Sequence, residues 1–113
     1  MPFINVKTNC AVDKNKETAI KSKLGQAITA IPGKSEAWLM VGIEPGYKLY
    51  FQGTDAPCAI ADVSILGTAS ASVLSDLTGR ITDVISGELD IQPSRIYVKY
   101  SQHPEWGWNG SNL

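Results

Sequence analysis

Proline directly follows the initiator methionine in this chain, which opens Met1-Pro2-Phe3. Initiator methionine is normally removed when the next side chain is small, so the mature chain is expected to begin with the secondary amine of Pro2. An ordinary α-amino group has a pKa of about 8, and apolar surroundings together with a nearby cation lower that pKa. Pro2 is therefore a candidate general base for proton transfer near neutral pH.

The two cysteines offer no competing chemistry. Cys10 and Cys58 are far apart, and the chain has a single histidine, so no zinc-binding spacing occurs. Both are expected to be small buried hydrophobic residues. The sequence therefore predicts no metal site.

Length and composition predict one folded domain over residues 1–113, because 43% of the residues are hydrophobic and only 19% are charged. The net charge of −1 does not favour nucleic-acid binding. No apolar run approaches the roughly 20 residues that a membrane span needs, so membrane insertion is not expected. Lys7 and Asp13 interrupt the N-terminus too early for a secretory signal. We expect a cytoplasmic protein, with secretion by a leaderless route as the alternative.

The first half of the chain predicts a strand, a helix and two more strands. Residues 3–7 alternate as a strand does, and Asp13 is a candidate helix cap. Pro32-Gly33 ends the helix that follows. An apolar strand is expected at residues 37–43, and a shorter strand is expected at residues 47–51. The helix has one apolar face, formed by Ile20, Leu24, Ala27, Ile28 and Ile31.

The second half repeats this plan. A strand at residues 58–66 precedes an amphipathic helix at residues 73–85 and a strand at residues 95–100, and aligning Leu39 with Tyr97 superposes the two halves. Two pseudo-symmetric β-α-β repeats predict an α/β fold, α+β by some schemes, with a four-stranded main sheet backed by two helices. The other face of the sheet needs a cover, because it is expected to carry Trp38, Met40, Ile60 and Val98. We therefore expect self-association, with a monomer as the alternative.

The chain resembles the macrophage migration inhibitory factor and D-dopachrome tautomerase family along its whole length. The segments that carry the resemblance are Met1-Pro2, Thr8-Asn9, Gly33-Lys34, Pro57-Cys58-Ala59, Gly67, Arg95-Ile96-Tyr97 and the tail Gly107-Trp108-Asn109-Gly110-Ser111. The resemblance implies a homotrimer with a barrel-like centre and with active sites between subunits. It also implies keto–enol tautomerisation of small aromatic α-keto acid or enol substrates such as phenylpyruvate or dopachrome, without metal or organic cofactor.

The resemblance also assigns the site. Pro2 would be the catalytic base, Lys34 would anchor the substrate carboxylate, and Leu66, next to Ile65, would supply a backbone donor. Tyr97 would come from the neighbouring subunit. Aromatic surfaces would come from Trp38, Trp106 and Trp108. Without the resemblance, Lys34 would be interpreted as a solvated cation near a helix end and Tyr97 as a core residue.

Four positions depart from relatives. Lys99 stands where vertebrate relatives tend to have asparagine, and it shares a face with Tyr97, so it could add a second cation to the site; it could also extend into water. Ala61 replaces the second cysteine of a Cys-x-x-Cys, which removes support for a thiol-oxidoreductase role. Trp106 and Leu113 differ from the residues commonly seen at the rim, so the resemblance does not fix the substrate preference.

Two other functions compete with the tautomerase. One is a cytokine-like ligand of a cell-surface receptor in which the tautomerase site is vestigial. The other is another isomerase or dehalogenase of the wider tautomerase superfamily, which the chain length and the C-terminal motif disfavour. The receptor-binding surface has no portable motif, so the sequence does not decide between tautomerase and ligand.

Overall fold

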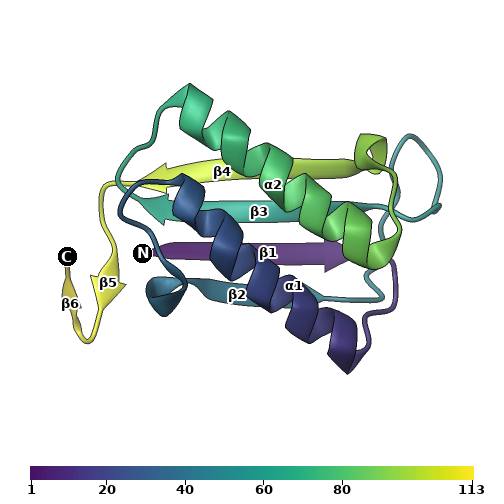
Figure 1. Cartoon of the computed structure of the whole chain (residues 1–113), viewed down its shortest axis with the longest axis horizontal. Helices are drawn as coiled ribbons and strands as arrows, with labels where there is room; N and C mark the ends of the chain where they lie inside the picture. Colours follow the sequence, from purple (N-terminus) through teal and green to yellow (C-terminus); the bar gives the residue numbers. More distant parts are fainter.

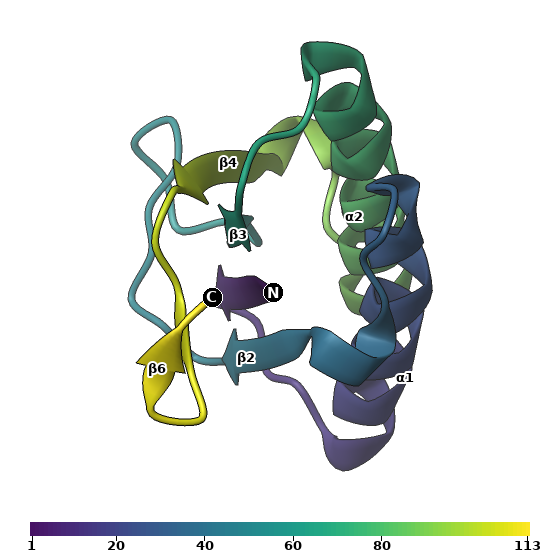
Figure 2. The same ribbon diagram turned by 90° about the vertical axis from the view of Figure 1, so that its left-hand side faces the viewer.

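A computed structural model describes residues 1–113, and it contains one four-stranded sheet with two helices on one face (Figures 1 and 2). The strand order is β2-β1-β3-β4. The strands are β1 (Pro2–Thr8), β2 (Met40–Glu44), β3 (Ala59–Leu66) and β4 (Ile96–His103), and the helices are α1 (Lys14–Ala27) and α2 (Ala71–Leu89). The predicted fold class is therefore confirmed.

Two β-α-β units form this sheet. β1 and β2 are parallel and joined through α1, whereas β3 and β4 are parallel and joined through α2. β1 and β3 pair antiparallel in the middle, and the two helices run in opposite directions (Figure 1). This arrangement confirms the predicted pseudo-two-fold repeat.

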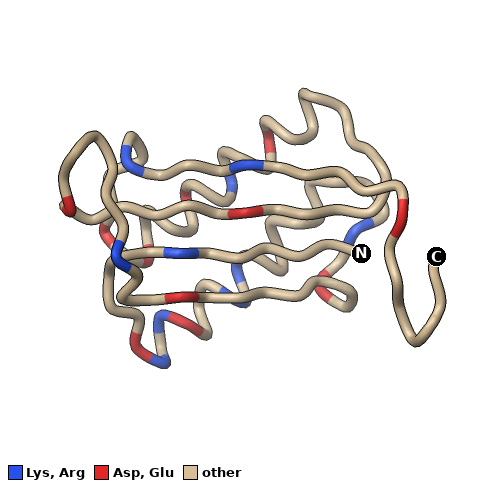
Figure 3. Tube along the Cα trace, turned by 180° about the vertical axis from the view of Figure 1, so that it is seen from behind, with Lys and Arg blue, Asp and Glu red and all other residues tan.

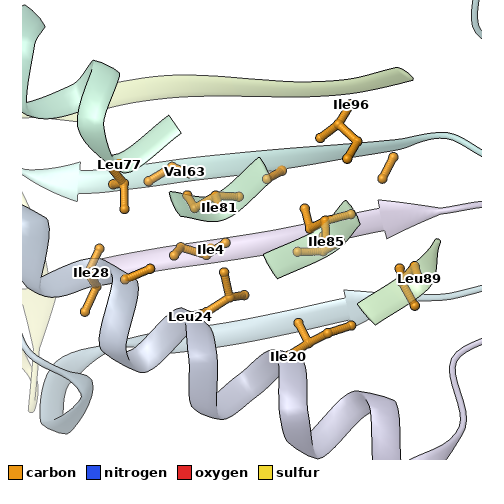
Figure 4. Close-up of a cluster of buried hydrophobic side chains, with 14 of the residues drawn as sticks. Ile4, Ile20, Leu24, Ile28, Val63, Leu77, Ile81, Ile85, Leu89 and Ile96 are labelled. Atoms are coloured by element: carbon orange, nitrogen blue, oxygen red, sulfur yellow. The ribbon is translucent and has the colours of Figure 1, made fainter. Parts of the chain in front are cut away.

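The core lies between the sheet and the helices. Alternate residues of β1 and β3, such as Ile4 and Val63, are fully buried and face the helices. Figure 4 shows them against Ile20 and Leu24 of α1 and Ile81 of α2. Because side chains alternate between the two faces of a strand, the intervening residues face away from the helices.

Local signals set the helix ends. Asp13 caps α1, since its side chain accepts a hydrogen bond from the Lys16 N–H at 2.8 Å. Ser70 caps α2 by accepting from the Val73 N–H at 3.3 Å. α2 ends at Leu89, and the next residue, Asp90, has a left-handed φ of 55°. Both predicted helices are confirmed, and α2 extends beyond the predicted range at both ends.

One strand prediction was wrong, and another began three residues too early. Residues 47–51 form a loop rather than a strand, because Phe51 makes only an isolated bridge with Thr54 and no neighbouring strand pairs with the segment. Trp38 lies in a short 3-10 helix, Glu36–Trp38, and β2 begins only at Met40. A C-terminal hairpin of β5 (Gly107–Trp108) and β6 (Ser111–Asn112) was not predicted.

The open face of the sheet is more polar than expected. Val98 packs against the core on the helix side, so of the four apolar residues proposed for this face only Met40 and Ile60 belong to it. Figure 3 shows charges of both signs along the strands. Three cross-strand contacts lie here: Asn5 Nδ2 to Glu44 Oε2 at 2.8 Å, Lys99 Nζ to Asp62 Oδ2 at 3.5 Å and Ser64 Oγ to Ser101 Oγ at 3.0 Å.

Neither helix is long and apolar enough to cross a membrane.

Candidate active site

Pro2 is the first residue of β1 and is buried opposite Ile65 of β3. Proline lacks an N–H, so the start of a strand is a position where it costs no ladder hydrogen bond. Met1 directly precedes the strand, and its carbonyl oxygen accepts a hydrogen bond from the Leu66 N–H at 3.1 Å. The N-terminus is therefore fixed against the end of β3.

Lys34 reaches the same point from the loop after α1. Gly33, with a φ of 82°, turns the chain, and the Lys34 N–H donates to the Ile31 carbonyl at 3.1 Å. The Lys34 Nζ then donates to the Leu66 carbonyl at 3.2 Å. Leu66 thus offers both backbone groups here, one bound to Met1 and one bound to Lys34.

The environment of the N-terminus favours a neutral amine. Burial lowers the pKa of the Met1 amine below its ordinary value of 8.0, and the charge and hydrogen bonding of Lys34 lower it further. Both causes disfavour the protonated form. This end of the sheet is therefore suited to a base that must be unprotonated near neutral pH.

An aromatic cavity of about 430 Å³ opens beside Pro2. The rings of Trp38 and Trp108 meet edge to face, with their centroids 5.1 Å apart. Most of the lining is hydrophobic, which suits a small flat ligand. The lining residues are Met1, Pro2, Phe3, Ala37, Trp38, Leu39, Met40, Trp106, Gly107 and Trp108.

The cavity continues into a second hollow of about 500 Å³ on the open face. Phe3, Met40 and Trp106 belong to both. His103 and Glu105 form the polar side of the second hollow, and the His103 ring lies 5.9 Å from that of Trp106. Sequence reasoning missed Phe3, Met40 and His103, although strand alternation would have put Phe3 on the open face.

The side chain of Ile65 does not line this cavity. It is fully buried in the core on the helix side, so Ile65 can offer the site only its backbone. Leu66, in contrast, is half-buried and presents its backbone next to Lys34.

Tyr97 and Lys99 lie at the other end of the sheet. Tyr97 is opposite Ile60 of β3, whereas Pro2 is opposite Ile65. These β3 positions are five residues apart, which corresponds to about 17 Å along a strand. A single chain therefore brings together Pro2, Lys34, Leu66 and the tryptophans, but not Tyr97 or Lys99.

No three His, Cys, Asp or Glu side chains meet as a metal-binding group. Cys58 is buried and Cys10 is half-buried, and neither forms a disulfide.

Known proteins similar to this chain match it from end to end. The family profile described as macrophage migration inhibitory factor (MIF) covers residues 1–113. The macrophage migration inhibitory factor of Mus musculus is 28% identical over 115 residues, which include 100% of this chain and 99% of the relative. The homologue from Brugia malayi is 22% identical over the same shares of both chains.

Solved structures agree with this assignment. The crystal structure of Leishmania major MIF2 has a TM-score of 0.94 and 31% identity, covering 100% of this chain and 97% of that chain. The homologue from Prochlorococcus marinus has a TM-score of 0.83 and 25% identity, with 97% of each chain covered. On both the sequence and the fold, this chain belongs to the macrophage migration inhibitory factor family.

Proposed function

We propose that this chain is a keto–enol tautomerase that uses the Pro2 amine as its general base. Membership of the family supports a tautomerase or cytokine-like function in general terms. The observation that carries the finer proposal is that Lys34 and the Leu66 backbone contact the N-terminal residue, while Met1 and Pro2 line an aromatic cavity. Its substrates are small aromatic α-keto acids or enols of the phenylpyruvate or dopachrome type.

The proposed reaction moves one proton within the substrate. The neutral amine of Pro2 removes a proton from one atom of the keto–enol system and returns it to another, so no redox partner is needed. Lys34 supplies a positive charge to the substrate carboxylate, and the Leu66 N–H donates to a substrate oxygen. Trp38 and Trp108 hold the aromatic ring.

Removal of Met1 is a condition of this mechanism. While Met1 is present, the Pro2 nitrogen is part of an amide and is not basic. The Met1 carbonyl also occupies the Leu66 N–H at 3.1 Å. Loss of Met1 therefore provides the base and frees a hydrogen-bond donor in one step.

We further propose that the active unit is a homotrimer with its sites between subunits. The open sheet faces would surround a barrel-like centre, and each site would take Tyr97 and Lys99 from the neighbour. The separation of Tyr97 from Pro2 within one chain supports this arrangement.

The test is a phenylpyruvate enol–keto conversion assay on the wild type and on Pro2→Gly, with mass spectrometry of both samples. We expect Pro2→Gly to lower kcat by about 10²- to 10⁴-fold, the usual contribution of a positioned base. Undiminished activity in Pro2→Gly, or an active protein that retains Met1, would contradict the proposal.

A receptor-ligand role is the second candidate, favoured by relatives that carry the name of a macrophage migration inhibitory factor. In that case the protein would be exported and would bind a cell-surface receptor. Receptor binding that survives Pro2→Gly would assign the biological role to the surface rather than to the tautomerase site.

A further inference from the structure

Two tyrosines of β4 differ in what holds their hydroxyl groups. The Tyr100 hydroxyl lies 2.7 Å from the Thr78 hydroxyl and donates to the Leu74 carbonyl at 3.0 Å, so it fastens β4 to α2. Tyr97 is 59% exposed, and its hydroxyl makes no hydrogen bond within the chain. The Tyr97 hydroxyl is thus free to bind a group outside its own subunit.

The ring of Tyr97 is nevertheless held in place. The Phe51 ring meets it edge to face, with the centroids 4.7 Å apart and the planes at 76°. Such a pair restricts the rotation of an otherwise exposed side chain. The free hydroxyl therefore projects from a ring that has a fixed neighbour.

Phe51 is itself fixed by a tight turn. Its N–H donates to the Thr54 carbonyl at 2.9 Å, and the Thr54 N–H donates back at 3.1 Å. Gln52 and Gly53 complete the turn with φ values of 52° and 77°. Two consecutive left-handed residues are typical of the tight turns that close hairpins.

Arg95 ties this turn back to the start of β4. Its Nε donates to the Pro57 carbonyl at 2.9 Å, and its Nη2 donates to the carbonyls of Ala56 at 3.0 Å and Thr54 at 3.3 Å. The guanidinium carbon also lies 5.4 Å from the centre of the Phe51 ring. Because the guanidinium is a rigid planar fork, it fixes several acceptors at once.

We infer that Phe51 and Arg95 are positioning residues that hold the Tyr97 hydroxyl ready for the Pro2 cavity of the neighbouring subunit. This inference rests on the proposed function, which places Tyr97 in that site. An exposed tyrosine without such support would lose side-chain freedom each time a substrate bound, and that loss would weaken catalysis. Arg95 therefore positions Phe51, Phe51 positions Tyr97, and only Tyr97 touches substrate.

A double-mutant cycle on kcat/KM tests whether Phe51 acts through the Tyr97 hydroxyl. We expect Phe51→Leu to lower kcat/KM by about 3- to 10-fold, the rate equivalent of one aromatic pair. The same substitution should have little effect in a Tyr97→Phe background, because the hydroxyl that it positions is gone. Equal losses in the two backgrounds would overturn the inference.

Three further variants separate positioning from general stability. Phe51→Tyr keeps the ring contact and should retain activity, and Tyr50→Leu removes an exposed neighbouring aromatic residue that has no ring partner, so it should behave as the wild type. Arg95→Lys keeps the charge but loses the fork, and should show part of the Phe51→Leu loss. Light scattering on each variant verifies that the oligomer is intact.

NMR of tyrosine-labelled protein tests the geometry even if phenylpyruvate is not converted. We expect Tyr97 to populate one χ1 rotamer with contacts to the Phe51 ring, and Phe51→Leu to average it. A rotationally averaged Tyr97 in the wild type would overturn the inference. A fixed Tyr97 in an inactive wild type would instead refute the proposed tautomerase while leaving the positioning intact.

Discussion

The two ends of the sheet are built for different tasks. At the Pro2 end, a partly buried N-terminus lies beside the cation Lys34 and lines a cavity together with tryptophan rings. At the Tyr97 end, an exposed ring is supported by a loop whose carbonyl groups are held by Arg95. The first end lowers the pKa of the N-terminal amine, whereas the second end restricts the orientation of the Tyr97 side chain.

Asn9 adds to the fastening of the second end. Its Nδ2 donates to the carbonyls of Asp55 at 3.0 Å and Ala56 at 3.1 Å, and its Oδ1 accepts from the Cys58 N–H at 3.0 Å. The loop is therefore anchored by Asn9, directly after β1, as well as by Arg95, directly before β4. On the proposed function, each end of the sheet carries part of the site, and a complete site would take residues from two subunits.

Among variants that keep Pro2, the largest change should come from Lys34. Lys34→Met removes the charge from the Pro2 end and is expected to lower kcat/KM by about 10- to 100-fold, because hydrogen bonds to a charged group contribute about 1.5–3 kcal/mol. Steady-state kinetics with phenylpyruvate measures the loss. Lys14→Met, on the exposed start of α1, is the matched control and should not change activity. Equal effects of the two variants would show that the Pro2 end has no special need of a cation.

Mixed oligomers test whether the two ends act across subunits. Tyr97→Phe alone should cost about tenfold, the rate equivalent of roughly one hydrogen bond. Refolding it with an equal amount of Pro2→Gly gives about half of the intact Pro2 residues a neighbour with intact Tyr97, so activity per Pro2 should rise about fivefold.

The control for this experiment pairs Pro2→Gly with Lys34→Met. Both residues belong to the same end of the same chain, so no mixed oligomer rebuilds an intact site around a working Pro2 with its own Lys34. Activity should not rise on mixing. A rise here, or none with Tyr97→Phe, would place the halves of the site differently from the proposal.

The smallest effect is expected from Lys99. A nearby cation lowers the pKa of an amine, and the base acts when neutral, so Lys99→Asn should move the acidic limb of the pH–rate profile to higher pH. The shift should be smaller than that of Lys34→Met, because Asp62 Oδ2 lies 3.5 Å from Lys99 Nζ and offsets its charge. Asp62→Asn should move the limb the other way. An unchanged acidic limb in Lys99→Asn would remove Lys99 from the site.

Much of the fold could be predicted because its signals are local. The alternation of residues 3–7 and the apolar faces of the helices depend only on neighbours along the chain. Residues 47–51 show the limit of this reasoning, since an apolar segment becomes a strand only where another strand pairs with it. The residues of the segment itself do not show whether a distant strand will pair with it.

The candidate site divides in the same way. Pro2, Lys34 and Leu66 could be named from the family resemblance, and the structure joins Lys34 to Leu66 and Leu66 to Met1, the residue before Pro2. His103 could not be found, because its place beside Trp106 depends on where β4 ends relative to the tail. The paired charges of Lys99 and Asp62 likewise depend on strand register, which periodicity alone does not determine.

The C-terminal hairpin lies beside the N-terminus in both ribbon views (Figures 1 and 2), and the Leu113 N–H donates to the Trp106 carbonyl at 2.9 Å. Purification tags at either terminus would therefore project into or over the cavity, and an N-terminal tag would also convert the Pro2 amine into an amide. Recombinant protein should therefore be prepared untagged or with an internal tag. The exposed turn around Gln52 and Gly53 can take such a tag, but only in experiments that do not concern Tyr97. Activity measured on protein with extra residues at either end would therefore reflect those residues as well as the native site.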